Sequence, residues 1–170
     1  MLIVSDTTPI ISLMKAELLD LLEKMFGDVY IPQAVYDELT SNPNYPVEAK
    51  LVQNSTFIKV GAVQNAQSVN KLMCEAGLDL GECEALVFAM EQNADLLLMD
   101  EHKGRQTAQK MGITITGTVG ILLQAYDEGL IDAGSIWRSV REMRKNNMRI
   151  GPVFDTIIVE HIGKEKDKEQ

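Results

Sequence analysis

The chain contains no long apolar run. None of its stretches approaches the roughly 18 consecutive apolar residues of a membrane-spanning helix. Its start also lacks the charged, then apolar, then small pattern of a signal peptide. There are only two cysteines, Cys74 and Cys83, and two histidines, too few and wrongly spaced for a four-ligand zinc site. These absences predict a cytoplasmic protein that does not associate with membranes, with both thiols reduced and half-buried.

Positive charge is also scarce. The 170 residues include 16 Lys and Arg against 25 Asp and Glu, a formal net charge of −9. This balance argues against a nucleic-acid partner, since affinity for phosphates comes mostly from Lys and Arg. Divalent cations held by carboxylates can reverse the sign locally, however, and five basic residues fall in one short segment. This basic segment is either a solvated helix face or a phosphate-contacting patch, and its members are Arg138, Arg141, Arg144, Lys145 and Arg149.

The chain does have the length and apolar content for a core. With 170 residues and 45% hydrophobic content, it can fold as one domain. Short apolar runs alternate with segments of helical periodicity, which is typical of βαβ units and a parallel sheet. The predicted strands are residues 2–5, 29–31, 57–60, 96–99 and 113–116.

The segments between these strands have helical periodicity. One continuous helix is predicted from residue 9 to residue 25, and another begins at Glu82, directly after Gly81. After Gly151 we favour a last helix, although residues 156–159 are mostly β-branched. Residues 163–170 are rich in lysine and acids and are predicted to form a flexible tail.

Two acidic residues directly follow predicted strands. Asp6 comes just after the first apolar run and Asp100 just after the most apolar one. Because ligands of open parallel sheets bind beyond the carboxyl ends of the strands, acids at two such ends predict a shared site. Glu38, in a predicted helix, and Glu82, at a helix start, can add two more carboxylates. The sequence therefore indicates a metal site at one edge of the sheet.

Four motifs that contain these acids occur in order along the chain. They are Val4–Ile11 (VSDTTPII), Ile31–Leu39 (IPQAVYDEL), Leu80–Ala85 (LGECEA) and Leu98–Glu101 (LMDE). Together they resemble a PIN-like domain, in particular the small prokaryotic PIN proteins related to VapC-type toxins. Gly117–Leu122 (GTVGIL) is similar to the stretch after the last core strand in an uncharacterised branch of that family.

The resemblance covers residues 1–130 and implies a fold and an activity. The fold would be a three-layer α-β-α arrangement with a mainly parallel central sheet of about five strands, and residues 131–162 would be a C-terminal helical extension of the same domain. The implied activity is metal-dependent RNA cleavage by a PIN-like nuclease core. A small antitoxin protein that blocks the cleft and a homodimer are further implications. The implied catalytic and metal-binding residues are Asp6, Glu38, Glu82 and Asp100.

These four carboxylates also suit Mg²⁺ or Mn²⁺ on chemical grounds. Hydrolysis of a phosphodiester needs an activated water and neutralised phosphate charge, and hard divalent cations supply both. Mg²⁺ takes one or two protein carboxylates and keeps waters, so four acids can hold one or two ions. Without metal the acids repel one another, and some should bind protons more tightly than usual.

Each acid also has a structural alternative. Asp6 could cap the next helix, and Glu38 could be a solvated helix residue, with the adjacent Asp37 as a competitor. Glu82 is favoured at a helix start simply by the helix dipole, and Glu84 competes with it. Position in the resembling motifs selects Glu38 and Glu82, with Glu84 as a residue that supports the ligands.

The neighbours of the acids supply candidate substrate contacts. Glu101 can reach a second ion or cap the helix that follows it. Thr7 and Thr118 can orient a water or a phosphate oxygen through their hydroxyls, or can serve as helix caps. Lys103 and Arg105 can meet substrate phosphate or can be ordinary surface residues.

The leading hypothesis is a divalent-metal-dependent endoribonuclease, and the resemblance extends it to the toxin of a toxin–antitoxin pair. The alternative is a weak or inactive RNA- or protein-binding module, which the acidic balance favours. A phosphatase-like hydrolase ranks last, because no short motif supplies a nucleophile together with a second acid. A chelator discriminates between the first two, since only the nuclease loses its activity.

Overall fold

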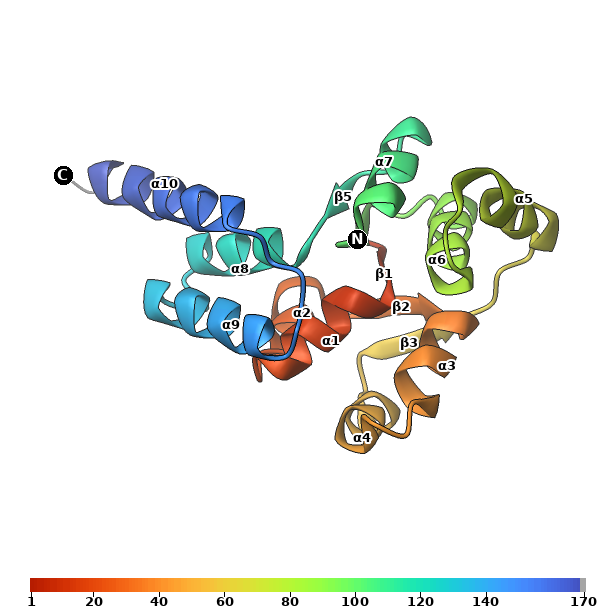
Figure 1. Cartoon of the computed structure of the whole chain (residues 1–170), viewed down its shortest axis with the longest axis horizontal. Helices are drawn as coiled ribbons and strands as arrows, with labels where there is room; N and C mark the ends of the chain where they lie inside the picture. Colours follow the sequence, from red (N-terminus) through yellow and green to blue (C-terminus); the bar gives the residue numbers. More distant parts are fainter. Residues whose placement is uncertain (169–170) are drawn as a thin grey trace.

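The chain folds around one sheet of five parallel strands (Figure 1). The structure is a computed structural model that describes residues 1–168, with side chains described as far as residue 164. In spatial order the strands are β3 (Ile58–Gly61), β2 (Val29–Pro32), β1 (Ile3–Ser5), β4 (Leu96–Leu98) and β5 (Ile115–Thr116).

Helices cover both faces of the sheet (Figure 1). Most begin within a few residues of a strand end, as expected for βαβ connections. They are α1 (Thr7–Lys15), α2 (Asp20–Phe26), α3 (Gln33–Ser41), α4 (Pro46–Asn54), α5 (Ala66–Ala76), α6 (Leu80–Glu91), α7 (His102–Lys110), α8 (Thr118–Asp127), α9 (Ala133–Lys145) and α10 (Val153–Lys168).

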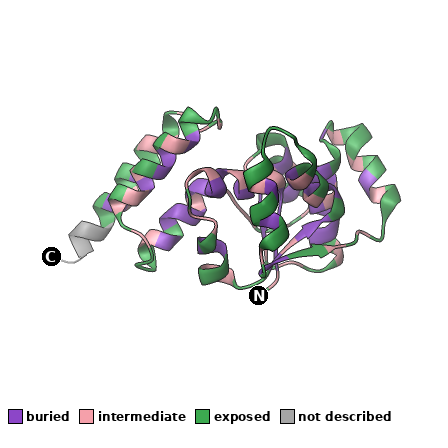
Figure 2. Cartoon of the chain, turned by 90° about the horizontal axis from the view of Figure 1, so that it is seen from below, coloured by how far each residue is buried: buried purple, intermediate pink, exposed green. Residues whose placement is uncertain are grey.

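The side chains of the central strands point alternately to the two faces of the sheet, which divides the core into two clusters. Ile3 of β1 and Leu98 of β4 pack with α1, α2, α3, α8 and α9, whereas Val4 and Leu97 pack with α6 and α7 on the opposite face. Successive strand side chains point to opposite faces, and a sheet covered on both faces needs apolar residues at consecutive positions. Figure 2 shows the buried residues gathered on the sheet and on the helix faces turned toward it. The predicted three-layer α/β fold with a parallel sheet is confirmed.

The C-terminal helices pack on the first of these clusters. Ile136 and Val140 of α9 are buried in it together with Ile158 and Ile162 of α10. The favoured last helix is present, and α10 continues to Lys168, so residues 163–168 of the segment predicted as a flexible tail have helical backbone. Residues 169–170 of that predicted tail lie outside the described residues. Among the described residues, no helix is both long and apolar enough to cross a membrane.

Two predicted helix boundaries are wrong. The helix expected over residues 9–25 is divided into α1 and α2, because Glu17 adopts a left-handed φ of 58° and the Leu18 amide bonds back to the Leu13 carbonyl. The turn lets Leu18 pack against the core that α1 and α2 share. The other helix begins at Leu80 rather than at Glu82, because Asp79 is its N-cap.

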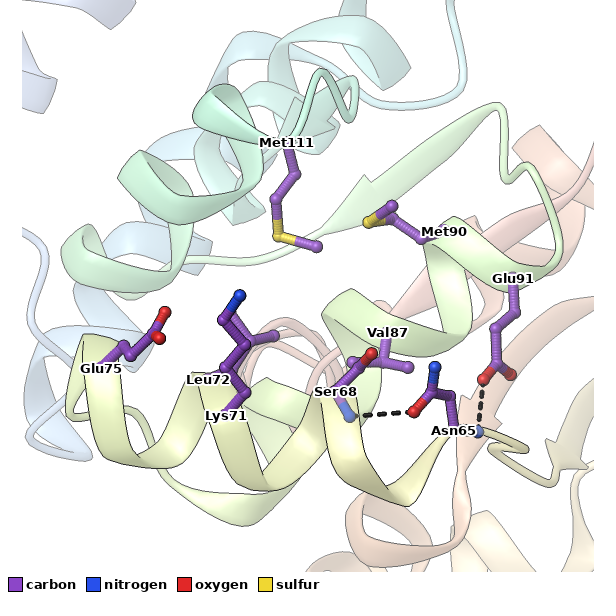
Figure 3. Close-up of a pocket in the computed structure, with 9 residues that line it drawn as sticks. All are labelled: Asn65, Ser68, Lys71, Leu72, Glu75, Val87, Met90, Glu91 and Met111. Carbon is purple, nitrogen blue, oxygen red and sulfur yellow. Dashed lines mark hydrogen bonds between the residues drawn. The ribbon is translucent and has the colours of Figure 1, made fainter.

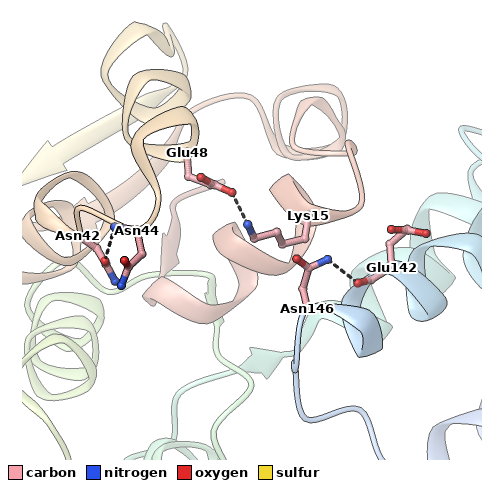
Figure 4. A network of polar contacts seen from close by, with 6 residues as sticks. All are labelled: Lys15, Asn42, Asn44, Glu48, Glu142 and Asn146. Atoms are coloured by element: carbon pink, nitrogen blue, oxygen red, sulfur yellow. Dashed lines mark hydrogen bonds and ion pairs between the residues drawn. The ribbon is translucent and has the colours of Figure 1, made fainter.

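One ion pair joins α1 to α4 (Figure 4). Lys15 Nζ bonds to Glu48 Oε1, both side chains are mostly buried, and the Lys15 ammonium lies 4.7 Å from the centre of the Tyr45 ring. Burial opposes ionisation of Glu48, but the Lys15 hydrogen bond and charge, with a backbone N–H, hold its pKa below the usual value of 4.5. The charged pair is therefore the favoured state of the folded protein.

Replacing Lys15 with methionine is expected to reduce the free energy of unfolding by about 1 kcal/mol at neutral pH. Because the pKa of Glu48 is lowered by folding, this stabilisation is present above pH 4.5 and is lost as the pH falls below that value. Urea denaturation across this pH range checks the prediction. The matched control is Lys24→Met, which removes the exposed Lys24–Asp20 pair and should cost at most about 0.5 kcal/mol. Equal losses in the two variants would contradict the prediction.

Candidate functional site

The site lies where the connections of the sheet change direction. From β1 the chain runs outward to β2 and β3, and from β4 it runs to β5 on the other side. Ligands of open α/β sheets bind at the carboxyl edge of such a switch point. Asp6 follows β1 directly, and Asp100 stands two residues beyond β4. The two aspartates therefore flank the position where this fold class places its ligands.

Asp6 is a buried carboxyl group at the start of α1. Its side chain is 3% exposed, and its backbone N–H donates to the Leu98 carbonyl at 2.9 Å, which ties it to β4. In the described structure the Asp6 side chain makes no capping hydrogen bond to α1. The alternative role of Asp6 as a helix cap therefore lacks the hydrogen bond that defines such a cap. Burial, together with the charges of Glu82, Asp79 and Glu38, raises the pKa of Asp6 from 3.8 to about 8, with partial compensation from the Thr7 amide.

Glu38 reaches this site from α3. Thr7 Oγ1 donates to Glu38 Oε2 at 2.5 Å, and a Cβ on Gly81 would collide with the other oxygen of the same carboxylate. The missing side chain of Gly81 thus makes room for Glu38 at the start of α6. Burial and the charges of Asp79 and Glu84 raise the pKa of Glu38. Glu38 and its competitor Asp37 are both exposed, but Asp37 accepts its hydrogen bond from Gln33 within its own helix.

Glu82 and Glu84 both make structural hydrogen bonds. Glu82 accepts from the Asp79 backbone N–H at 3.0 Å while Asp79 accepts from the Glu82 N–H at 2.8 Å, which is a reciprocal capping box. Glu82 is 9% exposed, and burial with the charges of Asp79, Glu101 and Glu38 raises its pKa. Glu84 instead accepts from the Ala34 N–H at 2.9 Å and so fixes the first turn of α3, which carries Glu38.

Asp100 is held by the start of α8. Its Oδ1 accepts from the Thr118 N–H at 2.7 Å and its Oδ2 from the Thr118 hydroxyl at 2.5 Å. Burial raises the pKa of Asp100, and the Thr118 bonds and the charge of Arg105 offset part of that rise. Arg105 is itself anchored, since its Nη1 donates to the Met99 carbonyl at 2.8 Å. Thr118 is the first residue of α8 rather than its N-cap, which is Gly117, and its hydroxyl bonds to Asp100, a contact that the sequence did not predict.

The predicted residues at the start of α7 are less engaged. Glu101 accepts from the Gly104 N–H at 3.0 Å and so serves as the N-cap of α7, which was its alternative role. Lys103 is exposed on the first turn of that helix. Asp6, Glu38, Glu82 and Thr7 thus lie near one another, Asp100 after β4 contacts Thr118 of α8 and lies near Arg105 of α7, and Lys103 is at the surface.

The described carboxylates do not form a closed metal cage. Across the described residues, no group of three or more Asp, Glu, His or Cys side chains stands close enough to hold one ion. Hydrogen bonds from Thr7, from the Asp79 amide and from Thr118 keep the carboxylates of Glu38, Glu82 and Asp100 apart. Gathering around one cation therefore requires these side chains to exchange those bonds for the ion. The donor set fits a hard divalent cation, because it is all oxygen and includes a buried carboxyl group that caps no helix.

Sequence reasoning missed Asp79 as a member of the acidic site. Its charge raises the pKa of Asp6, Glu38 and Glu82 alike, so it lies near all three. The sequence did carry a signal, since Asp79 and Glu82 have the spacing of a capping box before a helix.

Cavities on the surface of the described residues include two that bear on the position of a site. One, of about 610 Å³, adjoins Asp100 and is bordered by α1, α7, α8 and the connection between α9 and α10. The other, of about 390 Å³, lies beside α5 and α6, and Figure 3 shows Met90 and Met111 beside it. None of the predicted site residues lines the second cavity. The first is lined by Asp100, Glu101, Arg105 and Thr118, whereas Asp6, Glu38 and Glu82 do not line it.

The lack of a side chain at Gly81 supplies a test of the position of Glu38. If the acids form the metal-dependent nuclease site that the sequence predicts, Gly81→Ala is expected to lower cleavage at least about tenfold, because the new Cβ displaces the Glu38 carboxylate and misplaced groups lose rate steeply. The free energy of unfolding should not fall, since alanine is favoured over glycine in a helix by about 0.5–1 kcal/mol.

The matched control for this variant is Gly134→Ala. Gly134 is also the second residue of a helix with an aspartate N-cap, but a Cβ there meets its nearest neighbour at an ordinary 3.4 Å. Activity assays and thermal denaturation of both variants check the prediction. Unchanged cleavage by Gly81→Ala would show that the observed position of the Glu38 carboxylate is not needed for activity.

A family model described as a PIN domain matches residues 2–164. The match extends past the four acidic motifs and includes α9 and most of α10. No curated protein matches the chain.

Proposed function

The chain belongs to the PIN-domain family, and on that premise we propose that it is a divalent-metal-dependent endoribonuclease. PIN domains are generally nucleases, which makes hydrolysis of a nucleic-acid backbone the expected class of reaction. The observation that carries the proposal is Asp6, a buried carboxyl group at the switch point with three further acids around it. Burying an ionised carboxylate without a partner costs several kcal/mol, so Asp6 either keeps its proton or pairs with a cation, and we take the cation to be the partner in the active state.

The residues have separate tasks in the proposed site. Asp6, Glu38, Glu82 and Asp100 would hold one or two Mg²⁺ or Mn²⁺ ions, with Glu101 close enough in the chain to join them. When bound, such an ion lowers the pKa of a water molecule and neutralises charge on the reacting phosphate. Because the pKa of Asp6 is about 8, its carboxyl group is mostly protonated at pH 7 and releases its proton as the cation binds.

The neighbouring hydroxyls and cation would orient the acids and the substrate. Thr7 holds Glu38 and Thr118 holds Asp100, so each hydroxyl is in place to take up a water or a phosphate oxygen when the carboxylate turns to the metal. Arg105, anchored on the Met99 carbonyl, is a basic residue whose charge acts on Asp100. Lys103 would contact the strand further out, from the exposed face of α7.

The direct test is cleavage of single-stranded RNA by the purified protein. We expect cleavage with Mn²⁺ or Mg²⁺ and none after addition of EDTA. A parallel single-stranded DNA substrate decides whether RNA is the preferred backbone. Cleavage that persists in EDTA would exclude a metal-dependent site.

A second candidate is a binding module with little or no turnover. The observation that favours it is that hydrogen bonds keep the acids from closing around an ion in this structure. Such a module would bind RNA or a protein partner equally well in EDTA and in Mn²⁺, and it would leave the RNA intact.

The finer biological proposal is that the protein is the toxin of a toxin–antitoxin pair. Its support is the likeness of the four acidic motifs to those of VapC-type proteins. A small antitoxin would cover the acidic cleft, and the protein would form a homodimer. Expression of the wild-type chain should then arrest bacterial growth, expression of Asp6→Asn should not, and light scattering should give twice the mass of 18.9 kDa.

A further inference from the structure

The 610 Å³ cavity beside Asp100 combines charged and apolar walls. Asp100 and Arg105 border it from the β4–α7 side, and Thr118 and Val119 border it from the start of α8. The opposite wall is the connection between α9 and α10, with Arg149 at its middle. In Figure 1 this connection runs from the end of α9 past α8 to the start of α10. The connection between the two C-terminal helices therefore contributes one wall of a space that Asp100 also borders.

This wall is held in place by Arg144. Its Nε donates to the Ile150 carbonyl at 3.0 Å and its Nη2 to the Gly151 carbonyl at 3.2 Å. The same guanidinium pairs with Asp155 in the first turn of α10 at 3.1 Å. One side chain thus ties the end of α9, the connection and the start of α10 together. A wall fixed in this way can present a side chain at a defined place opposite Asp100.

Within the basic segment, the structure separates Arg149 from its neighbours. Arg144 is engaged in the connection, Lys145 pairs with Glu142 at 2.9 Å, and Arg138 bonds to Ser135 at 3.1 Å. Arg141 is exposed on α9 and does not border the cavity, whereas Arg149 does. The basic segment is therefore not one uniform surface, and its last arginine faces the space beside the acids.

The lining fits a nucleotide better than a purely polar or purely apolar ligand. A guanidinium group binds phosphate oxygens with directed, charge-assisted hydrogen bonds, and Arg149 and Arg105 offer two such groups to one space. Met148, Phe154 and Val119 add apolar surface against which a base can lie. A cavity of about 610 Å³ lies in the range of small-molecule sites.

We propose that this cavity is a subsite for one nucleotide of the RNA strand, next to the scissile phosphate, with Arg149 as the phosphate contact that the C-terminal extension supplies. The inference rests on the proposed nuclease function, because it takes the strand to pass the acids at the switch point. It assigns the α9–α10 connection a role in substrate binding, and it makes Arg144 a positioning residue that acts through that connection.

The test is RNA affinity measured without relying on turnover. Fluorescence anisotropy of a short labelled single-stranded RNA in Ca²⁺ is compared for the wild type, Arg149→Gln and Arg141→Gln, with a gel to confirm that the RNA stays intact. The two variants lose the same charge from the same segment. Arg149→Gln should weaken binding about fivefold or more and reduce the slope of log affinity against log salt by about 0.7, as expected for one lost phosphate contact on a single strand. Arg141→Gln should stay within about twofold of the wild type.

Equal affinities of the two variants, or no measurable RNA binding by the wild type, would overturn the subsite. The cleavage assay with Asp6→Asn judges the nuclease separately. If the wild type cleaves RNA and Asp6→Asn does not, but the two arginine variants bind alike, the subsite fails and the nuclease stands. If Asp6→Asn cleaves as well as the wild type, the proposed nuclease site fails, and a selective loss of affinity in Arg149→Gln then shows only that RNA binds at this cavity, not that a scissile phosphate lies beside it.

Discussion

Replacing Asp6 with asparagine is expected to stabilise the metal-free protein by a few kcal/mol near pH 9 and to change its stability little near pH 4. Asparagine is close in shape to the protonated carboxyl group, so it keeps the packing and removes the charge. The pKa of Asp6 rises from 3.8 to about 8 on folding, because the group is buried among other acids. Each pKa unit corresponds to about 1.4 kcal/mol, which sets the scale of the effect.

The sign of this pH dependence follows from proton binding. Below pH 3.8 both the folded and the unfolded wild type keep the proton on Asp6, and no penalty arises. Between pH 3.8 and about 8 the unfolded chain releases the proton while the folded protein keeps it, so wild-type stability falls as the pH rises. Above about pH 8 both forms are ionised and the penalty is complete. The Asp6→Asn variant carries no such penalty at any pH.

Urea denaturation in EDTA at the two pH values measures this effect. The control is Asp37→Asn, which changes an exposed acid on α3 and should shift stability by less than about 0.5 kcal/mol at either pH. If Asp6→Asn changes the free energy of unfolding equally at both pH values, or lowers it near pH 9, then ionisation of the Asp6 carboxyl group does not destabilise the folded protein.

Cleavage of RNA in Mn²⁺ should fall by a factor on the order of 10³ or more in Asp6→Asn and in Asp100→Asn. Each change removes an anionic oxygen from the edge of the sheet where the connections change direction, and an amide is a weaker ligand for a hard cation. Both variants should stay folded, since Asp6→Asn relieves a buried charge and an asparagine at position 100 keeps one oxygen to accept from Thr118.

The same assay discriminates between the paired acids of the site. Glu38→Gln should lose most of the activity, whereas Asp37→Asn should retain it within about threefold, because Asp37 bonds only within its own helix in the described structure. Equal activity of all four variants and the wild type would mean that the cleavage comes from a contaminant or from another site.

Much of this site could be predicted because strand ends are visible in the sequence. The apolar runs before Asp6 and Asp100 define buried strands, and the carboxyl edge of a parallel sheet then brings the two acids together. Glu38 could be preferred to Asp37 only through the resembling motif. The helical periodicity does not show which of these two adjacent acids points to the site. The contacts with Thr7 and Gly81 that distinguish them depend on how α3 packs against α1 and α6.

The parts that could not be predicted depend on local turns and on distant packing. The break between α1 and α2 rests on one left-handed residue, Glu17, which has no sequence signature of the kind that glycine gives. The role of Arg149 depends on the path of the chain after α9, and that path is fixed by Arg144 and by the packing of α10. Both features arise from contacts between segments. Hydrophobic periodicity describes each segment by itself and does not show such contacts.

The central claim is that carboxylates from separate segments of the chain bind one cation site, and a Mn²⁺ titration of the melting temperature tests it most directly. At a concentration of about 100 Kd, the ion should stabilise the wild type by about 2.7 kcal/mol, which corresponds to roughly 5–10 °C for a domain of this size. Asp6→Asn should begin from a higher melting temperature in EDTA near pH 9 and should gain little from Mn²⁺. A wild-type melting temperature that Mn²⁺ leaves unmoved, or an equal gain in Asp6→Asn, would contradict the proposed site.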